Sequence, residues 1–362
     1  MYKELGLLKF KLFFEGINID GHTIAALKIN GYRVPSIVRT GASYGIEAIV
    51  NDMLYVNIPI NKHSPIHVSK TFKEIIMDDN STYNIEILKH PISVPHEKDG
   101  TSLQNTWKTC FDRLDITLYS GCCFMEERKG CKFCGIDKTP SFNDRYLMDA
   151  NNLTRILENT LNDPNNKIKH VLLSGGVLPD KEYGANIFAE ATRIIKSIHP
   201  QLPVYVMLPP SENDSTLQLL VDSGIDEIGI NIEVIDSNYR KRLIPRKEII
   251  GIERYFSALE YLSNRLPKYG ARSILMGGIE PIQSTLKGVD ELCKRGIMPI
   301  ISHYRAVGNK LLSFIESGEH MYDLWQAAMD IADKYGMVVG PTCIPCQNNV
   351  IALPSGSPFQ YY

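Results

Sequence analysis

Residues 118–136, LYSGCCFMEERKGCKFCGI, limit what this chain can be more than any other part of it. Within thirteen residues they contain four of the chain's eight cysteines. An apolar alternation at Leu114, Ile116 and Leu118 leads into this stretch and predicts a strand. Cysteines this dense on a glycine-flanked loop favour a metal site over packing, because thiolates are good ligands of iron–sulfur clusters and zinc. The four are Cys122, Cys123, Cys131 and Cys134.

Composition and charge narrow the class of protein. The chain has 362 residues, enough to bury a large core, and we expect one large domain with an appendage. A net charge of −2 and a pI near 6.5 provide no field that attracts nucleic acid or an anionic membrane. The early apolar run 7–14 is interrupted by Lys9 and Lys11, unlike a secretory signal, and no stretch reaches transmembrane length. We therefore expect a cytoplasmic protein whose cysteines are thiols or metal ligands.

The first 105 residues predict a small β-rich N-terminal domain. Residues 52–60 alternate apolar and polar side chains, as a half-buried strand does. Residues 73–88 predict a hairpin with its turn at 78–81. Prolines and a glycine within 91–100 indicate a linker to a second domain over 106–362.

The second domain alternates short aliphatic runs with amphipathic helical stretches. This alternation predicts an α/β fold, either a partial or full (β/α) TIM-like barrel or an open doubly wound sheet. In both folds function lies at the carboxyl ends of the strands, where the cysteine loop leaves the first one. The predicted strands are 115–119, 168–173, 203–208, 227–232, 272–275 and 298–302, and the clearest helices are 185–198, 250–262 and 322–335.

Gly121-Cys122 followed by the CKFC motif of residues 131–134 resembles the radical S-adenosylmethionine (radical SAM) superfamily. The resemblance implies a [4Fe–4S] cluster on three cysteines, usually spaced CxxxCxxC with an aromatic residue before the last, which is Phe133 here. It also implies that SAM binds the open iron. Reductive cleavage of SAM would then yield a 5′-deoxyadenosyl radical that abstracts hydrogen from a substrate.

The first cysteine spacing departs from this pattern. Cys122 precedes Cys131 by nine residues instead of four. Gly-Cys is the usual junction at the end of the strand, which favours Cys122 as first ligand and leaves Cys123 as the alternative. The resemblance thus assigns the cluster to Cys122, Cys131 and Cys134.

Further motifs resemble the superfamily's SAM-binding elements. Gly175 and Gly176 end the second predicted strand, where backbone contacts the SAM amino group, but Val177 stands where a glutamate often follows. Asn231 and Glu233 resemble the Asn-x-Asp pair that meets the SAM ribose in biotin synthase-like enzymes. Strand alternation would place both on one side.

Two more elements complete the implied SAM site. Arg246 follows Glu233 by thirteen residues, a spacing found in that subgroup, and could pair with the SAM carboxylate. Glu233 could instead form an ion pair at the barrel rim. Residues 274–280, ILMGGIE, resemble the element that packs on adenine, with Gly277 and Gly278 leaving room for the base.

A second cysteine pair, Cys343 and Cys346, follows an apolar stretch at 337–339 that predicts a late strand near the open end of the barrel. The pair could hold a second iron–sulfur cluster, bind zinc together with Cys110 or Cys123, or act as a redox pair. A structural turn is the alternative.

The sequence therefore predicts an oxygen-sensitive radical SAM enzyme. It would act on a small-molecule substrate, accept electrons from a ferredoxin- or flavodoxin-like donor, and bind neither nucleic acid nor membrane. The layout is loosely similar to uncharacterised radical SAM proteins near nitrilase-type gene clusters, which name no substrate. The alternative is a zinc-binding scaffold or regulatory protein with a structural four-cysteine site, which leaves Phe133 and the glycine pair unexplained.

Overall fold

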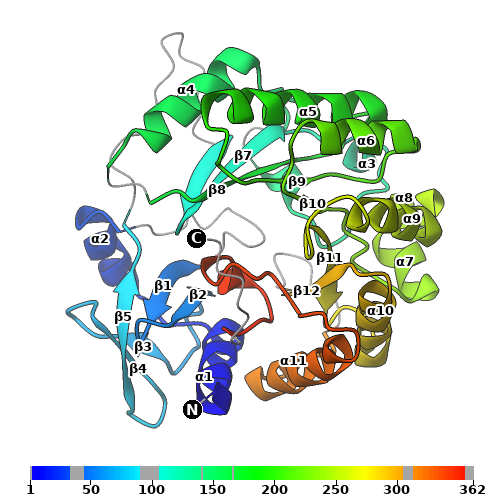
Figure 1. Cartoon of the computed structure of the whole chain (residues 1–362). Coiled ribbons are helices and arrows are strands. Elements are labelled where there is room, and N and C mark those ends of the chain that lie inside the picture. The colour runs from blue at the N-terminus through cyan, green and yellow to red at the C-terminus, as the bar shows by residue number, and fades with distance from the viewer. Residues whose placement is uncertain are drawn as a thin grey trace.

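The computed structural model describes residues 2–32, 45–89, 106–139, 142–164, 167–304 and 313–354. In these residues the chain forms a large curved sheet surrounded by helices and a smaller antiparallel sheet beside it (Figure 1). The linker predicted within 91–100 lies outside the described residues.

The large sheet has seven strands in the order β12-β11-β10-β9-β8-β7-β6. Strands β7 to β12 are parallel, and β6 pairs antiparallel with β7 at one edge. Spatial order follows chain order without the reversal of a doubly wound sheet, and β12 does not pair with β6, so this is an open, partial (β/α) barrel. The strands are β6 Trp107–Cys110, β7 Arg113–Tyr119, β8 His170–Gly175, β9 Val204–Met207, β10 Glu227–Gly229, β11 Ala271–Gly277 and β12 Met298–His303.

Helices connect the parallel strands and cover the outside of the sheet (Figure 1). Aspartates fix where several helices begin, because Asp149, Asp180 and Asp236 each accept hydrogen bonds from backbone N–H groups of the first turn. The α-helices are α3 Cys123–Glu126, α4 Ala150–Leu161, α5 Lys181–Ile198, α6 Asp214–Asp222, α7 Ser237–Leu243, α8 Pro245–Ile250, α9 Ile252–Ser263, α10 Ile282–Lys294 and α11 Gly318–Asp333, with short 3-10 helices η2 Ile136–Lys138 and η3 Pro345–Asn349.

All six predicted barrel strands are present, with one difference at the site. Strand β10 ends at Gly229 instead of residue 232. Glu233 beyond it has a left-handed backbone (φ 68°) and makes an isolated bridge to Leu275 of β11. The fourth strand end is therefore a turn held against β11.

The small sheet has the order β2-β1-β5-β4-β3 and is antiparallel. It contains the predicted strand and hairpin, together with strands that were not predicted. The separation into two domains at residue 105 stays a prediction. The strands are β1 Ile46–Val50, β2 Leu54–Ile58, β3 His67–Val68, β4 Glu74–Ile76 and β5 Thr82–Ile87.

Two N-terminal helices were also not predicted, α1 Tyr2–Glu15 and α2 Gly21–Ile29. Helix α1 lies beside α11 at the bottom of Figure 1 and also contacts β2. Phe10, Leu12 and Phe13 are all buried, so apolar side chains surround much of α1 and hide its helical period in the sequence.

Residues 340–351 follow β12 and close part of the open side of the barrel. Gly340 N–H donates to Pro299 O at 2.9 Å, and Ile351 N–H donates to Ile301 O at 2.7 Å. The late strand predicted at 337–339 is wrong: these residues are irregular, and only Gly340 forms a bridge, to Ile300.

Lys9 of α1 anchors this C-terminal segment from below. Its ammonium group is buried and donates to Gln347 O at 2.8 Å and Ala352 O at 2.5 Å. Burial lowers the pKa of Lys9 to about 7. The apolar run that contains Lys9 is thus part of a packed helix.

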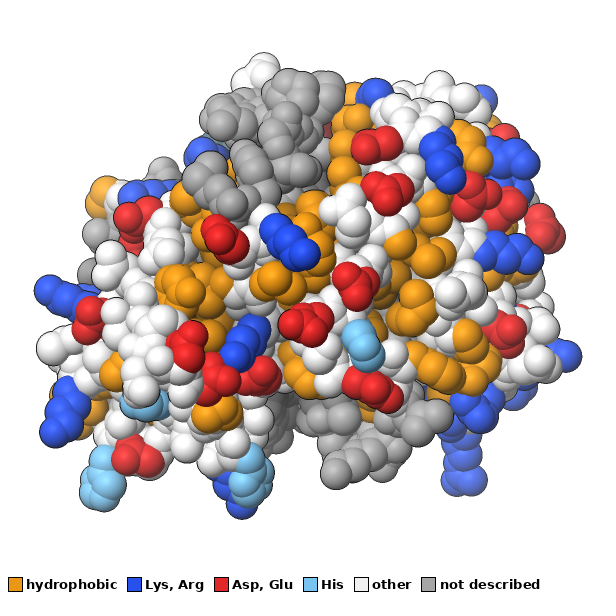
Figure 2. Space-filling model, turned by 90° about the horizontal axis from the view of Figure 1, so that it is seen from below, with side chains coloured by type: hydrophobic (Ala, Val, Ile, Leu, Met, Phe, Trp, Pro, Cys, Tyr) orange, Lys and Arg blue, Asp and Glu red, His pale blue; other side chains and the backbone are white. Residues whose placement is uncertain are grey.

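The face shown in Figure 2 carries acidic and basic side chains interspersed among apolar ones, with no continuous field of one sign. Among the described residues, no helix combines the length and apolar character needed to cross a membrane.

Candidate functional site

A cavity of about 430 Å³ opens at the carboxyl ends of the parallel strands. Most of the sequence-predicted cofactor residues line it, although they come from three separate parts of the chain. Arg246 and Cys123 are not among the lining residues. Those that line it are Cys122, Cys131, Cys134, Gly175, Gly176, Asn231 and Glu233.

The adjacent cysteines after β7 have different surroundings. Cys122 precedes α3 and lines the cavity. The Cys123 thiol donates to Leu178 O at 3.4 Å, and its backbone N–H donates to Val177 O at 2.8 Å. The turn into α3 thus gives the cavity the first thiol and places the second against the segment after β8.

The CKFC turn is held by the far side of the barrel. Lys132 N–H donates to Leu243 O at 2.8 Å, and Cys134 N–H donates to Cys131 O at 3.0 Å. Phe133 lines the cavity and packs on an apolar cluster that includes Ile244. These contacts place Cys131 and Cys134 in the same cavity as Cys122.

Cys131 lies in a site that disfavours a lone thiolate. Burial raises its pKa well above the ordinary value, and the nearby Glu233 carboxylate raises it further. The thiol donates to Glu233 Oε2 at 3.8 Å. Since metals bind the thiolate, loading iron here must release a proton.

The two glycines after β8 are needed for close packing of chain segments. A Cβ on Gly176 would lie 1.6 Å from Gly121 O, and a Cβ on Gly175 would lie 2.8 Å from Tyr119 O. From the sequence, glycine was expected here because the backbone would approach a ligand closely. In the structure these glycines bring β8 against the loop that carries Cys122.

Lys247 is the cavity residue that sequence reasoning missed. Its ammonium group lies 2.7 Å from Glu233 Oε2 and donates to Asn231 O at 2.8 Å. Burial alone would lower its pKa, but the Glu233 carboxylate raises it above the ordinary value. The ion pair considered for Glu233 therefore exists, inside the cavity. One lysine beside Arg246 gave no signal in the sequence.

The turn that carries these residues is strained. Glu233 adopts a left-handed φ of 68°, uncommon for a residue with a side chain. Its N–H donates to Ile274 O, while Asn231 Oδ1 accepts from Ile274 N–H at 3.1 Å. Bonds to β11 thus hold a costly conformation that directs the carboxylate into the cavity.

Arg246 lies behind the cysteine loop. Its Nε is 3.3 Å from Glu127 Oε2, and its guanidinium lies 6.0 Å from the centre of the Phe124 ring. The structure thus places this arginine where it braces α3 and not where it lines the cavity.

The ILMGGIE element contributes a different residue from those expected. Met276 lines the cavity, whereas Gly277 and Gly278 do not. A Cβ on Gly277 would lie 2.9 Å from Ile301 and 3.4 Å from Leu324 of α11, so this glycine serves helix packing. Gly278 has a φ of 94°, which a turn requires.

Comparison with known proteins finds a match over the segment that carries these residues. The sequence model of the radical SAM superfamily matches residues 116–292. Just under half of the chain, from β7 to α10, is thus similar to the radical SAM superfamily. All eight residues assigned to the cluster and SAM lie within the matched segment, and Cys343 and Cys346 lie outside it.

Curated relatives of the chain include lipoyl synthases from two strains of Halobacterium salinarum, each 27% identical over 171 residues. The similarity covers 47% of this chain and 52% of each relative, so the chain spans about half the length of the curated relatives it matches.

Solved structures similar to it include methylornithine synthase (PylB), at 15% identity and a TM-score of 0.47 over 68% of this chain and 75% of that chain. HydG, a maturase of the [FeFe]-hydrogenase, matches at 14% identity and a TM-score of 0.47 over 61% and 50% of the two chains.

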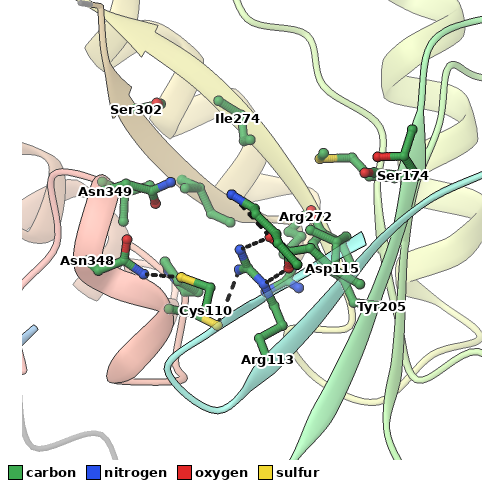
Figure 3. Close-up of a pocket in the computed structure, with 18 of the residues that line it drawn as sticks. Cys110, Arg113, Asp115, Ser174, Tyr205, Arg272, Ile274, Ser302, Asn348 and Asn349 are labelled. Carbon is green, nitrogen blue, oxygen red and sulfur yellow. Dashed lines mark hydrogen bonds and ion pairs between the residues drawn. The ribbon is translucent and has the colours of Figure 1, made fainter. Parts of the chain in front are cut away.

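A second cavity of about 390 Å³ occupies the barrel interior (Figure 3). Four residues line both cavities, so the two adjoin. At its inner end, Arg113 is paired with Asp115, and the Arg272 guanidinium stacks on the Tyr205 ring at 3.4 Å. The shared residues are Thr139, Met207, Ser302 and Asn349.

The charged residues of this interior are buried within strands. Arg272 pairs with Glu227, and its Nε has no hydrogen-bond partner. Arg113 and Lys108 hold the pKa of Asp115 below its ordinary value, although burial alone would raise it. The sequence contained one signal for this interior cavity, which is the presence of charged residues in otherwise apolar strands, at positions 113, 115, 227 and 272.

Cys343 and Cys346 lie at the opposite end of the barrel from the one expected. With Asp112 and His170 they offer four donor atoms within 4.8 Å of one another. Asp112 directly precedes β7 and His170 begins β8, so the group lies at the amino ends of the strands.

The thiols considered as partners of this pair are engaged elsewhere. Cys110 donates to Glu47 Oε1 at 3.2 Å, and Cys123 contacts Leu178. Two cysteines, a histidine and an aspartate thus lie close enough to share one metal ion, and this set differs in composition from the predicted one.

Proposed function

We propose that this protein is a radical SAM enzyme that abstracts hydrogen from a small molecule bound inside the barrel. One observation carries the proposal: three thiols from the loop after β7 line one cavity with the glycine pair of β8 and the Asn231–Glu233 turn. When bound there, a [4Fe–4S] cluster and SAM supply the 5′-deoxyadenosyl radical on reduction.

The donor set fits such a cluster. Cys122, Cys131 and Cys134 provide three soft ligands and leave one iron for a cofactor. The directions of the adjacent thiols favour Cys122 over Cys123. They also disfavour the alternative of a closed four-thiol zinc site, because Cys123 faces the Leu178 carbonyl.

Protein groups around the cluster position it. Contact of Gly176 with Gly121 fixes the start of the cysteine loop, and the bond from Lys132 to Leu243 fixes its end. Phe133 and Met276 provide apolar walls that exclude water from the reacting centre.

We assign SAM binding to the backbone of Gly175 and Gly176 and to the side chains of Asn231 and Glu233. Lys247 holds the Glu233 carboxylate in place and adds a positive charge to the pocket. Arg246, proposed from sequence for the SAM carboxylate, would have to leave Glu127 to reach it.

We place the substrate in the interior cavity, which adjoins the SAM cavity. Its cations Lys108, Arg113 and Arg272 outnumber the two carboxylates paired with them. A small molecule with an anionic group suits this excess, and the unpartnered Nε of Arg272 offers it a donor.

The reaction also needs an electron donor of the ferredoxin or flavodoxin type and a reducing, cytoplasmic setting. We further propose that Cys343 and Cys346 take part in a second metal site, separate from the cluster.

Anaerobic purification and reconstitution test the assignment. We expect about four irons and four sulfides per chain in the SAM cavity. SAM and a strong reductant should then yield 5′-deoxyadenosine. A chain that binds only zinc and forms no nucleoside would overturn the proposal.

A further inference from the structure

We propose that Asp112, His170, Cys343 and Cys346 form a structural zinc site that fastens the C-terminal segment to the amino end of the barrel. This inference depends on the four side chains alone and holds whether or not the proposed radical chemistry is correct.

The donors come from three separate segments. Asp112 and His170 precede or begin neighbouring strands, and Lys169 N–H donates to Asp112 O at 2.7 Å. Cys343 and Cys346 flank the start of η3. Chain elements thus hold the donors from both sides of the gap between barrel and C-terminal segment.

Their distances suit a single small ion. His170 Nε2 lies 3.1 Å from Cys346 Sγ, Cys343 Sγ lies 4.0 Å from Asp112 Oδ1, and every pair lies within 4.8 Å. Zinc bonds of about 2.3 Å to sulfur and 2.0–2.1 Å to nitrogen or oxygen place tetrahedral donors about 3.3 to 3.8 Å apart. Side-chain shifts of less than about 1 Å, outward for the His170–Cys346 pair and inward for the Cys343–Asp112 pair, bring the group to this geometry.

The donor types favour zinc over an iron–sulfur cluster. Two thiolates, an imidazole and a carboxylate make a mixed tetrahedral set that zinc accepts. Cluster ligands bind separate irons and are mostly cysteines. The four donors lie close together and two of them are not sulfur, so they indicate a single ion.

The surroundings match a closed structural site. Cys343, Cys346 and His170 are buried. Arg113 donates to Cys346 Sγ at 3.4 Å, which stabilises a ligating thiolate and offsets the negative charge of three anionic ligands on a divalent ion.

The position of the site gives it a structural role. Directly after Cys346, Asn348, Asn349 and Val350 form part of the interior cavity wall (Figure 3). Zinc would hold this wall in place against β7 and β8. It therefore shapes the cavity that we assign to the substrate, whose wall includes Cys346, and lies at the opposite ends of the strands from the three cluster cysteines.

Metal analysis in a full-length chain that cannot hold the catalytic cluster tests the site. In Cys122→Ala/Cys131→Ala/Cys134→Ala we expect about one zinc per chain and no iron. Adding Cys343→Ser and Cys346→Ser should remove that zinc. Cys293→Ala is the matched control, because Cys293 is a buried thiol of α10 outside the donor group, and it should retain the metal.

X-ray absorption at the zinc edge of the wild-type chain keeps the proposal testable if those variants do not fold. It should show two sulfur ligands at about 2.3 Å and two lighter ligands. Zinc bound to three or four sulfurs, or to none, contradicts the site. So does iron with sulfide in the triple variant, zinc that persists without Cys343 and Cys346, or a disulfide between them. Failure of the radical assay alone leaves it intact.

Discussion

The two ends of the barrel carry two sulfur-containing sites of opposite design. At the carboxyl end, three thiols come from one loop of thirteen residues and face a cavity, with Cys134 exposed. At the amino end, four donors come from three segments that span more than 230 residues of the chain, and three of the donors are buried. A three-ligand site on a cavity leaves room for a reactant, whereas a closed four-ligand site leaves none.

This difference teaches how one metal-ligand chemistry can serve two purposes. In our proposal the open site depends on the cavity around it, including the Lys247–Glu233 pair, to bind SAM. The zinc site that we propose would complete its own coordination, so its metal-binding energy would be available to join chain segments. Variants at each end should therefore separate loss of cofactor chemistry from loss of stability.

The largest effect is expected at the open end. Cys131→Ala or Cys134→Ala should reduce iron from about four per chain to near zero and abolish 5′-deoxyadenosine formation, because a cluster held by two thiols is labile. Thermal unfolding should change little. Iron analysis of Cys122→Ala beside Cys123→Ala then identifies the first ligand: only Cys122→Ala should lose the cluster, and the reverse result would reassign it to Cys123.

At the closed end the order of effects should be reversed. Cys346→Ser should retain the catalytic iron but lower the unfolding temperature by at least about 5 °C, because a structural metal is lost. Calorimetry with and without added zinc measures this, and zinc should raise the unfolding temperature of the wild type only. Equal unfolding temperatures for Cys346→Ser and the wild type would contradict a structural metal at the amino end of the barrel.

A glycine substitution tests how the barrel supports the open end. Gly176→Ala places a Cβ 1.6 Å from Gly121 O, so the cysteine loop must move. We expect a stability loss of roughly 2 to 4 kcal/mol and reduced cluster retention. Denaturant unfolding and iron content report both. Gly184→Ala in α5 is the control: its nearest neighbour is Leu178 at 3.6 Å, and it should be neutral or stabilising.

Lys247 and Arg246 are adjacent in the chain but should differ in their effect on SAM binding. Lys247→Met leaves the half-buried Glu233 carboxylate without its ion pair, so we expect SAM affinity to fall by about tenfold or more. Arg246→Met should weaken binding less, since that side chain pairs with Glu127 instead. Calorimetric titration of SAM into reconstituted protein ranks the two. A larger effect at Arg246 would restore the assignment made from sequence spacing.

The smallest effect concerns pH at the open end. Glu280 is buried and accepts from the backbone N–H groups of Ile235 and Asp236, and burial raises its pKa to about 7. A folded-state pKa above the unfolded value means that its stabilising contribution is present below about pH 4.5 and is lost as pH rises through 7. In Glu280→Gln, the loss of unfolding free energy between about pH 4.5 and pH 7 should therefore be smaller than in the wild type by roughly 1 to 3 kcal/mol. An unchanged slope would mean that Glu280 is ionised throughout.

Local pattern was sufficient for the barrel but not for everything packed around it. Short aliphatic runs, and the apolar alternation before the cysteine loop, identified all six parallel strands. Helix α1 was not predicted because apolar residues surround it. The residues at 337–339 resembled a strand, but neighbouring segments bury them without strand pairing. Burial alone does not distinguish these states when the period is weak.

The sequence alone was sufficient to predict the open site, because its three thiols, the aromatic residue and the glycine pair are local motifs. Only the tertiary structure decided which of Cys122 and Cys123 faces the cavity, that Lys247 meets Glu233, and that Asp112 and His170 join Cys343 and Cys346. Side-chain direction at a turn depends on its backbone dihedrals, and donors from separate segments of the chain converge only when the tertiary fold brings those segments together.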